Sequence, residues 1–194
     1  MCAVPEAGRV SPPRSRHPLL HRRSTWVVLA AAAVAAIVAT AVFQPWKLVV
    51  DERVQEAVPA APAAPAVSAG APAPTAPVVL ARGTLVSHEH DSSGTVAVLR
   101  LADGSRVLRL EDLRTSNGPR LQVWLSDAPV TPGTDGWRVF DDGRHVDLGD
   151  LKGNIGSSNY PVPPDVDLAT LPSVSIWCAR FSVSFAAAEL RPVG

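Results

Sequence analysis

Thr95-Val-Ala-Val-Leu-Arg-Leu-Ala-Asp-Gly-Ser-Arg-Val-Leu-Arg-Leu110 is the stretch that decides the fold. Apolar residues alternate on both sides of Asp103-Gly104, and an Asp-Gly pair between two such runs is a strong signal for a β-hairpin. If these two residues form the turn, Leu99 lies opposite Leu108 on one face of the ribbon. We expect that face to be buried and the other face, which carries Arg100 and Arg109, to be exposed to solvent.

The same alternation continues through the C-terminal region, as at Leu121, Val123 and Leu125. No segment there shows sustained helical periodicity, and Gly, Pro and Asp separate the short apolar runs. The pattern predicts an all-β domain over residues 78–194, with an antiparallel β-sandwich or a barrel-like fold. The residues that we expect in its core are Leu99, Leu108, Leu110, Val123, Ile176, Phe181 and Phe185.

The final apolar run, Ser173–Phe185, is interpreted as one strand that begins in the centre of the domain. Val174, Ile176 and Cys178 share one face of this strand, and Trp177 lies on the other. The first half is apolar on both faces, which is typical of a strand that is covered on both sides. The Cys178 side chain is therefore expected to point into an apolar layer.

Residues 26–43 form an apolar run without a charge. A helix of this length covers roughly 27 Å, enough for the hydrocarbon core of a bilayer. The preceding tail, residues 1–25, is rich in arginine, and the positive-inside rule places such a tail in the cytoplasm. We therefore expect a single-pass protein of the cell membrane, attached to the lipid bilayer by one transmembrane helix, with an extracytoplasmic C-terminal domain.

A cleaved export signal is the alternative interpretation of this run, because Ala39-Thr-Ala41 supplies a small-x-small cleavage site. Signal cores are usually 7–15 residues long, so the length of the run favours a retained anchor. Cleavage after Ala41 would still export the C-terminal domain.

The segment between the apolar run and the domain, residues 44–77, is expected to be a disordered linker. Ala57–Pro77 contains ten alanines and six prolines and no charge. Such a composition cannot bury a core and favours extended polyproline II stretches. We expect a passive stalk that holds the domain up to roughly 80 Å from the bilayer.

The charge balance of the chain argues against a nucleic-acid partner. Residues 78–194 contain eleven Lys and Arg against fourteen Asp and Glu, so this region is mildly acidic. Proteins that bind nucleic acid usually present a basic face. The zero net charge of the whole chain hides the difference between a basic tail and an acidic domain.

The two cysteines, Cys2 and Cys178, are expected on opposite sides of the membrane and cannot pair within one chain. An unpaired cysteine in an oxidising compartment is either buried in a core or kept for chemistry. Cys178 is thus the candidate redox residue, and Trp177 and Arg180 are its candidate supporting residues. The alternative, a small apolar core residue, stays open.

His88-Glu-His90 would place two imidazoles on one face of a strand, which makes His88 and His90 weak candidates for cofactor ligands. Asp91-Ser-Ser-Gly94 follows directly, so a solvated strand end is the competing interpretation. Metal sites usually combine three or four ligands, and no metal is expected. The Cys-x-x-Cys-His motif of covalent haem is absent, so a haem would be non-covalent or ligated by Cys178. No catalytic motif emerges, and an enzyme is not the expected class.

Several motifs resemble the DM-thirteen domain, also called the electron-transfer DM domain, in order and spacing over residues 80–191. Leu113, where the family usually has phenylalanine, and Arg120, where an acidic residue is common, depart from the pattern. The motifs that carry the resemblance are Gly94-Thr-Val-Ala-Val, Leu108-Arg-Leu-Glu-Asp-Leu-Arg-Thr-Ser-Asn-Gly-Pro119, Leu121-Gln-Val-Trp-Leu-Ser126, Leu148-Gly-Asp-Leu-Lys-Gly-Asn-Ile-Gly156, Val174-Ser-Ile-Trp-Cys178, Phe181-Ser-Val-Ser-Phe185 and Ala188-Glu-Leu190.

The resemblance implies a β-sandwich module on an extracellular or membrane-attached protein, with the cysteine of Trp-Cys as its signature residue. It also implies a redox role at Cys178, through a bare thiol or a cysteine-held prosthetic group. We therefore expect a redox or electron-transfer accessory that works with an envelope or redox partner protein. The alternative is a non-catalytic envelope binding or adhesion module in which Cys178 is structural.

Overall fold

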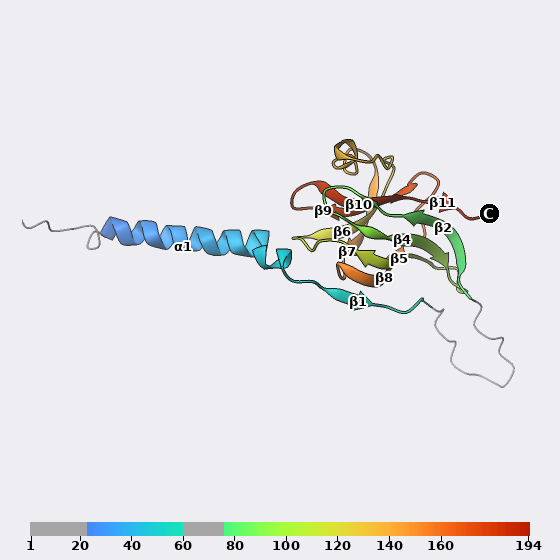
Figure 1. The fold of residues 1–194 in the computed structure, drawn as a ribbon, viewed down its shortest axis with the longest axis horizontal. Helices are drawn as coiled ribbons and strands as arrows, with labels where there is room; N and C mark the ends of the chain where they lie inside the picture. Colours follow the sequence, from blue (N-terminus) through green and yellow to red (C-terminus); the bar gives the residue numbers. More distant parts are fainter. Residues whose placement is uncertain (1–22, 60–75) are drawn as a thin grey trace, which may run out of the picture. The chain divides into compact units, whose positions relative to one another are not determined.

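The computed structural model describes residues 23–59 and 76–194. The chain divides into two compact units, Met1–Ala41 and Val42–Gly194. The described residues of the first unit, 23–41, all belong to helix α1, Arg23–Phe43, in which no residue is buried (Figure 1). Its length and apolar composition suit a membrane span, and a signal sequence near the N-terminus would show the same two properties.

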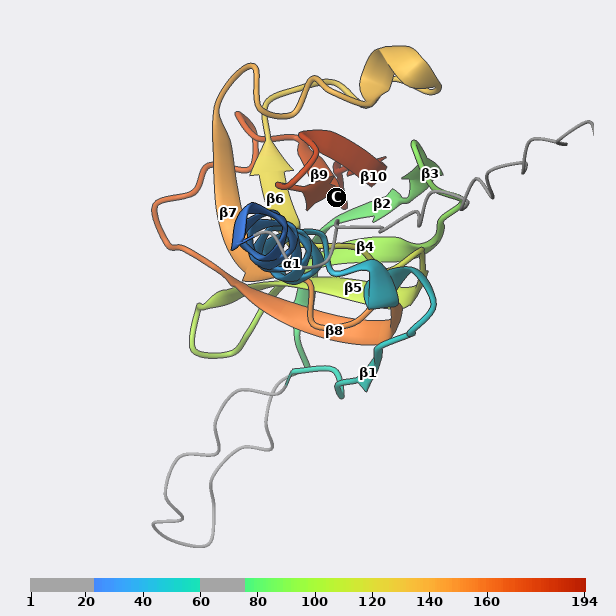
Figure 2. The same ribbon diagram turned by 90° about the vertical axis from the view of Figure 1, so that its left-hand side faces the viewer.

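The second unit is a sandwich of two β-sheets (Figure 2). One sheet has the order β1-β8-β5-β4-β2-β11, and its strands are Arg53–Gln55, Ile155–Val162, Arg106–Arg114, Ser93–Arg100, Val78–Thr84 and Arg191–Pro192. The other has the order β3-β10-β9-β6-β7, and its strands are Val86–Ser87, Val183–Glu189, Ser173–Cys178, Leu121–Ser126 and His145–Asp150. Two short 3-10 helices are Pro45–Leu48 and Thr134–Gly136. The predicted antiparallel all-β sandwich is confirmed, with a parallel β1–β8 pair as an addition.

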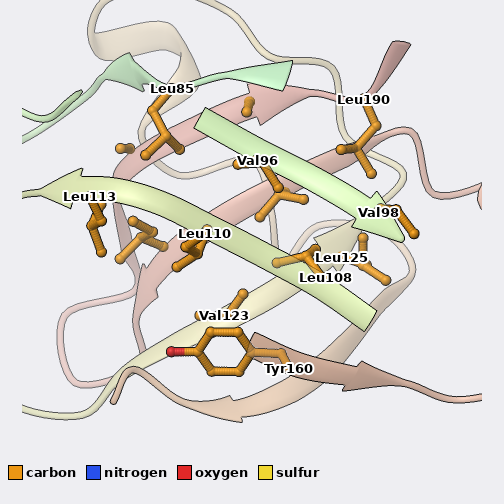
Figure 3. Close-up of a cluster of buried hydrophobic side chains, with 14 of the residues drawn as sticks. Leu85, Val96, Val98, Leu108, Leu110, Leu113, Val123, Leu125, Tyr160 and Leu190 are labelled. Carbon is orange, nitrogen blue, oxygen red and sulfur yellow. The ribbon is translucent and has the colours of Figure 1, made fainter. Parts of the chain in front are cut away.

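The main core lies between the two sheets and is built from the alternating apolar positions of both (Figure 3). Apolar residues alternate with polar residues along the strands because each sheet turns only one face to the other sheet. Tyr160 of β8 closes part of this layer with a side chain that is 1% exposed. The predicted core residues found in it are Leu108, Leu110, Val123, Ile176 and Phe185.

The β4–β5 hairpin has a register that differs by one residue from the prediction. Leu108 pairs with Val98, and Leu99 pairs with Val107. Leu101 and Ser105 close a three-residue loop in which Gly104 has a φ of +85°, so the turn is longer than Asp103-Gly104 alone. Because a one-residue shift exchanges the faces, Leu99 does not share a face with Leu108 as predicted. Leu99 is nevertheless buried, at 5% exposure, on the other face of the sheet.

The predicted final strand is a hairpin. β9 ends at Cys178, and the chain turns at residues 179–182, where Ser182 has a φ of +49°, before β10 begins at Val183. Phe181 lies in this turn and is 46% exposed, so its assignment to the core was wrong. The physical reason is that the turn removes Phe181 from the alternation that the uninterrupted strand would have given it.

Composition predicted a disordered linker over residues 44–77, but the first part of this segment, after α1, is structured. Residues 53–55 form β1 on the edge of β8, and the Glu52 backbone N–H donates to Asn154 Oδ1 at 2.7 Å. The stretch rich in Pro and Ala therefore connects β1 to β2 within one sheet instead of separating helix from domain. Most of that stretch, residues 60–75, lies outside the described residues.

Docking of this segment also explains why Arg109 is not exposed to solvent as expected. Its side chain is 5% exposed and forms an ion pair with Glu111 at 3.0 Å. Arg109 Nη1 donates to the backbone carbonyls of Glu56 and Ala57 at 3.1 and 3.2 Å. The backbone that follows β1 thus covers this part of the outer face of the sheet.

Candidate functional site

Cys178 is the last residue of β9, and its side chain is completely buried in the core between the sheets. This confirms that Cys178 points into an apolar layer beside Val174 and Ile176. Its Sγ donates a hydrogen bond to the backbone carbonyl of Pro119 at 3.3 Å. Pro119 lies in the loop before β6, so this contact joins the loop to the end of β9.

Burial raises the pKa of the Cys178 thiol above its ordinary value. The backbone N–H groups of Phe181 and Arg180 oppose this shift but do not outweigh the loss of solvation, which is the largest cause. The thiol is therefore protonated at neutral pH. Thiol–disulfide exchange and alkylation need an accessible thiolate, so the closed site does not favour nucleophilic chemistry.

The surroundings of Cys178 do not fit a prosthetic group. The side chain is 0% exposed and lies in close-packed apolar contacts, so its sulfur faces no space for a ligand. Within residues 23–59 and 76–194, no group of three or more His, Cys, Asp or Glu side chains could hold a metal ion. Any chemistry at Cys178 in this conformation is therefore chemistry of the thiol itself.

Trp177 faces away from Cys178 and belongs to a second apolar cluster on the outer side of the sheet. Its ring stacks on Trp124 of β6 with a centroid distance of 5.1 Å. The Trp124 ring in turn stacks on His145 of β7 at 4.1 Å, with 8° between the planes. His145 is exposed, so three stacked rings lead from the residue beside Cys178 to the surface.

Trp124 is 8% exposed, and its Nε1–H is buried without a hydrogen-bond partner among the described residues. An unsatisfied indole N–H costs free energy in a protein interior. Stacking on both ring faces and burial of a large ring are the interactions that offset this cost. Trp124 is therefore held between its two neighbours by packing instead of a polar contact.

Arg180, the second supporting candidate, lies exposed in the β9–β10 turn. Its charge lowers the pKa of Cys178, but this is the smallest of the causes that act on the thiol. Arg180 thus lies two residues after Cys178 in the chain without being a strong activator of the thiol. The negative charge of Glu89 raises the pKa of Cys178 and outweighs the effect of the Arg180 charge.

The structure separates His88 and His90 instead of bringing them together as ligands. His88 is 7% exposed, and its two ring nitrogens lie 2.8 Å from Ser184 Oγ and 3.2 Å from the Thr131 carbonyl oxygen. The carbonyl can only accept, so Nε2 carries the proton and Nδ1 accepts from Ser184. His90 instead packs its ring against Phe185 at 3.9 Å. The expected solvated strand end is therefore wrong for His88.

Burial also lowers the pKa of His88, because desolvation penalises the imidazolium. The loop that covers His88 depends on Gly136, whose missing side chain leaves room for the Thr131 carbonyl. With both nitrogens occupied, His88 is a structural residue that fastens this loop to β10. It is not available to a metal or haem in this conformation.

Trp124, His145 and Pro119 are the site residues that reasoning from sequence missed. Trp124 stood in a recognised strand, on the face opposite Leu121, Val123 and Leu125, which was a usable signal for an outward-facing ring. His145 and Pro119 come from other strands and loops, and only the sheet order brings them to β9.

A family model described as electron transfer DM13 matches residues 84–190, more than half of the chain. The matched region includes the Cys178 thiol, its Pro119 acceptor and all three stacked rings. No curated protein matches the chain, and no solved structure does.

Proposed function

Because the chain belongs to the electron transfer DM13 family, we propose that it is a membrane-anchored redox accessory with Cys178 as its redox-active residue. The observation that carries the proposal is the family match, which spans Trp177 and Cys178 of β9, the central strand of its sheet. Cys178 is also the free cysteine of the described residues. The domain would exchange electrons with a partner protein and would not turn over a substrate of its own.

The closed environment of Cys178 restricts the chemistry to electron exchange. The thiol loses one electron and its Sγ proton and becomes a sulfur-centred radical. The electron goes to a one-electron acceptor, an envelope partner protein, and the Sγ proton goes to water that local opening of the loop at Pro119 admits; reduction by the same class of partner reverses both transfers. The electron itself can leave without the sulfur reaching solvent, whereas nucleophilic attack needs an exposed thiolate.

The ring stack supports a route for the electron from Cys178 to the surface. Trp177 is the covalent neighbour of Cys178, and stacking continues through Trp124 to the exposed His145. The contact surface for the partner would then lie around His145 on β7. This strand is at the edge of its sheet, so a partner can approach it from the side.

Helix α1 supports attachment to a membrane with the domain outside the cytoplasm. The helix is 21 residues long and uncharged after Arg23, and arginines are concentrated before it. Positive charge is retained on the cytoplasmic side of membrane helices. The domain, which follows the helix, would be extracytoplasmic.

A second candidate function is a non-catalytic envelope binding module in which Cys178 is structural. Complete burial and the hydrogen bond to Pro119 favour this role, because free cysteine often serves as a small apolar core residue. The two functions differ in what replacement of Cys178 removes: electron exchange in the first, only stability in the second.

The test is anaerobic stopped-flow oxidation of the full-length chain by hexachloroiridate(IV), a one-electron oxidant, in a Cys2→Ser background. We expect the parent to consume an equivalent of oxidant that the Cys178→Ala variant does not, with both proteins folded by circular dichroism. Trp124→Leu should slow this phase without removing it. Equal consumption by the parent and Cys178→Ala would reject the redox role and favour the binding module.

A further inference from the structure

The β9–β10 turn presents an aromatic ring among three exposed arginines. Phe181 is 46% exposed at the apex of this turn, and its ring stacks on Phe43 with a centroid distance of 6.0 Å. Arg180 precedes it, and Arg138 braces the turn by donating from Nη1 to the Phe181 carbonyl at 3.0 Å. The Arg120 carbonyl accepts from the Ala179 N–H at 3.1 Å, which brings Arg120 to the same place. We call Arg120, Arg138, Arg180 and Phe181 the basic tip.

The positive charges of the basic tip are available to an external anion, although Arg138 Nη1 also donates to the Phe181 and Ser182 carbonyls. Among the described residues, none of Arg120, Arg138 and Arg180 forms an ion pair with a carboxylate. The carboxylates nearby are Glu89, which lies 3.9 Å from His90, and Glu52 and Asp150, which line the same groove as Arg120. Glu52 is paired with Lys47 at 3.7 Å. An exposed phenylalanine flanked by arginines without carboxylate partners is typical of surfaces that enter the interfacial layer of a membrane.

The chain that leads to the anchor is fastened beside the basic tip. Asn117 Nδ2 donates to the Val50 carbonyl at 2.9 Å, and Asn117 lies in the same loop as Arg120. Only residues 44–50 separate the end of α1 at Phe43 from this attachment point. Fully extended, seven residues span at most about 25 Å, and the 3-10 helix Pro45–Leu48 shortens that reach. The end of the domain that bears the basic tip is therefore kept close to the end of α1.

We propose that the basic tip docks on the membrane surface, with the Phe181 ring among the lipid headgroups and its arginines on the phosphates of anionic lipids. The inference rests on the membrane anchor of the proposed function. Charge complementarity and the short tether both favour this occupant, since the tether holds the tip at the surface at high effective concentration. Docking fixes the orientation of the domain, so that one end faces lipid and the His145 edge is left for a partner.

The experiment compares full-length chain in nanodiscs of phosphatidylcholine with chain in nanodiscs containing phosphatidylglycerol. Hydrogen exchange of the backbone amides of residues 179–183 is measured by mass spectrometry. We expect exchange of this turn to be slowed in the anionic nanodiscs and the protection to fall at high salt. Arg180→Glu should reduce the protection by about fivefold or more, as loss of an arginine at an anionic surface does, and Phe181→Ser should reduce it too.

Matched controls are Arg191→Glu and Val193→Ser, because Val193 is 48% exposed and Arg191 is an exposed arginine of β11, outside the β9–β10 turn. Both should keep the protection of the turn. The docking would be overturned if the chain co-elutes with nanodiscs but residues 179–183 exchange equally fast in the two lipids. It would also be overturned if the control variants lose as much protection as the variants of the basic tip. A chain that does not co-elute would refute the anchor and with it this inference, whereas the redox test on Cys178 is independent of both results.

Discussion

The Cys178 Sγ donates to the Pro119 carbonyl at 3.3 Å, and the residue after Pro119 accepts from the Ala179 N–H. These two contacts close the loop before β6 over the end of β9. The sulfur is sealed by this closure and by the core on its other side. The same closure brings Arg120 beside the β9–β10 turn, so the buried thiol and the basic tip depend on one piece of local structure.

Replacement of Cys178 should destabilise the domain whether or not the thiol is redox-active. Cys178→Ala removes a fully buried side chain and its hydrogen bond, and we expect a loss of about 1–2 kcal/mol in the free energy of unfolding. Cys178→Ser can direct its hydroxyl to the Pro119 carbonyl, so we expect a loss in the same range. Urea unfolding of the three proteins measures this. A Ser variant that is several kcal/mol worse than Ala would mean that the carbonyl is not within its reach.

Stability should fall on the acid side because of His88. In the folded chain burial lowers the pKa of His88, while the unfolded chain binds a proton below the ordinary value of 6.5. The contribution of neutral His88 is therefore complete above about pH 6.5 and is lost as the pH drops through the lowered pKa. His88→Gln should flatten this part of a plot of unfolding free energy against pH. An unchanged slope in the variant would assign the acid sensitivity to other groups.

Phe181 and Phe185 form a matched pair that tests the position of the turn. Phe185 is 3% exposed in the core, so Phe185→Ala should cost about 3–5 kcal/mol. Phe181 is exposed in the turn, and Phe181→Ala should change the free energy of unfolding by less than about 0.5 kcal/mol. Chemical denaturation in detergent gives both values. Similar losses in the two variants would restore Phe181 to the core.

The hairpin at 95–110 shows how much of the fold could be predicted from sequence. Alternation identified its strands, and Leu108 was placed correctly in the core because that inference needs only local periodicity. Leu99 is buried as predicted but was assigned to the wrong face, because the faces of two paired strands depend on the turn length and Gly104 closes a three-residue loop.

β1 and the ring stack could not be read from local patterns. Residues 53–55 are a three-residue strand whose stability comes from β8, about a hundred positions further along the chain. The Pro/Ala composition of the stretch that follows β1 led to the prediction of a linker for the whole region. The contact of Trp124 with His145 likewise follows from the sheet order, which no spacing in the sequence encodes.

Asn154 should hold the segment around β1 on the domain. Its side chain is 1% exposed and contacts the Glu52 N–H, the Asp51 carboxylate and the Thr115 carbonyl. Asn154→Ala leaves these groups unpaired, so we expect a loss of about 1–3 kcal/mol and faster proteolysis within residues 51–57. Gln122→Ala, which removes an exposed hydrogen bond to Asp147, is the control and should leave proteolysis unchanged. Equal proteolysis of all three proteins would show that β1 is held by other contacts.

The central claim is that Cys178 is a shielded, protonated thiol that acts by electron exchange and not as a nucleophile. The most direct measurement is the rate of iodoacetamide alkylation of Cys178 in the Cys2→Ser chain at neutral pH, folded and in denaturant. The account predicts that the folded chain reacts at least about a hundredfold more slowly, because reaction requires both opening of the site and loss of the thiol proton. A folded chain that reacts as fast as the unfolded one, or faster, would show an exposed thiolate and contradict the account.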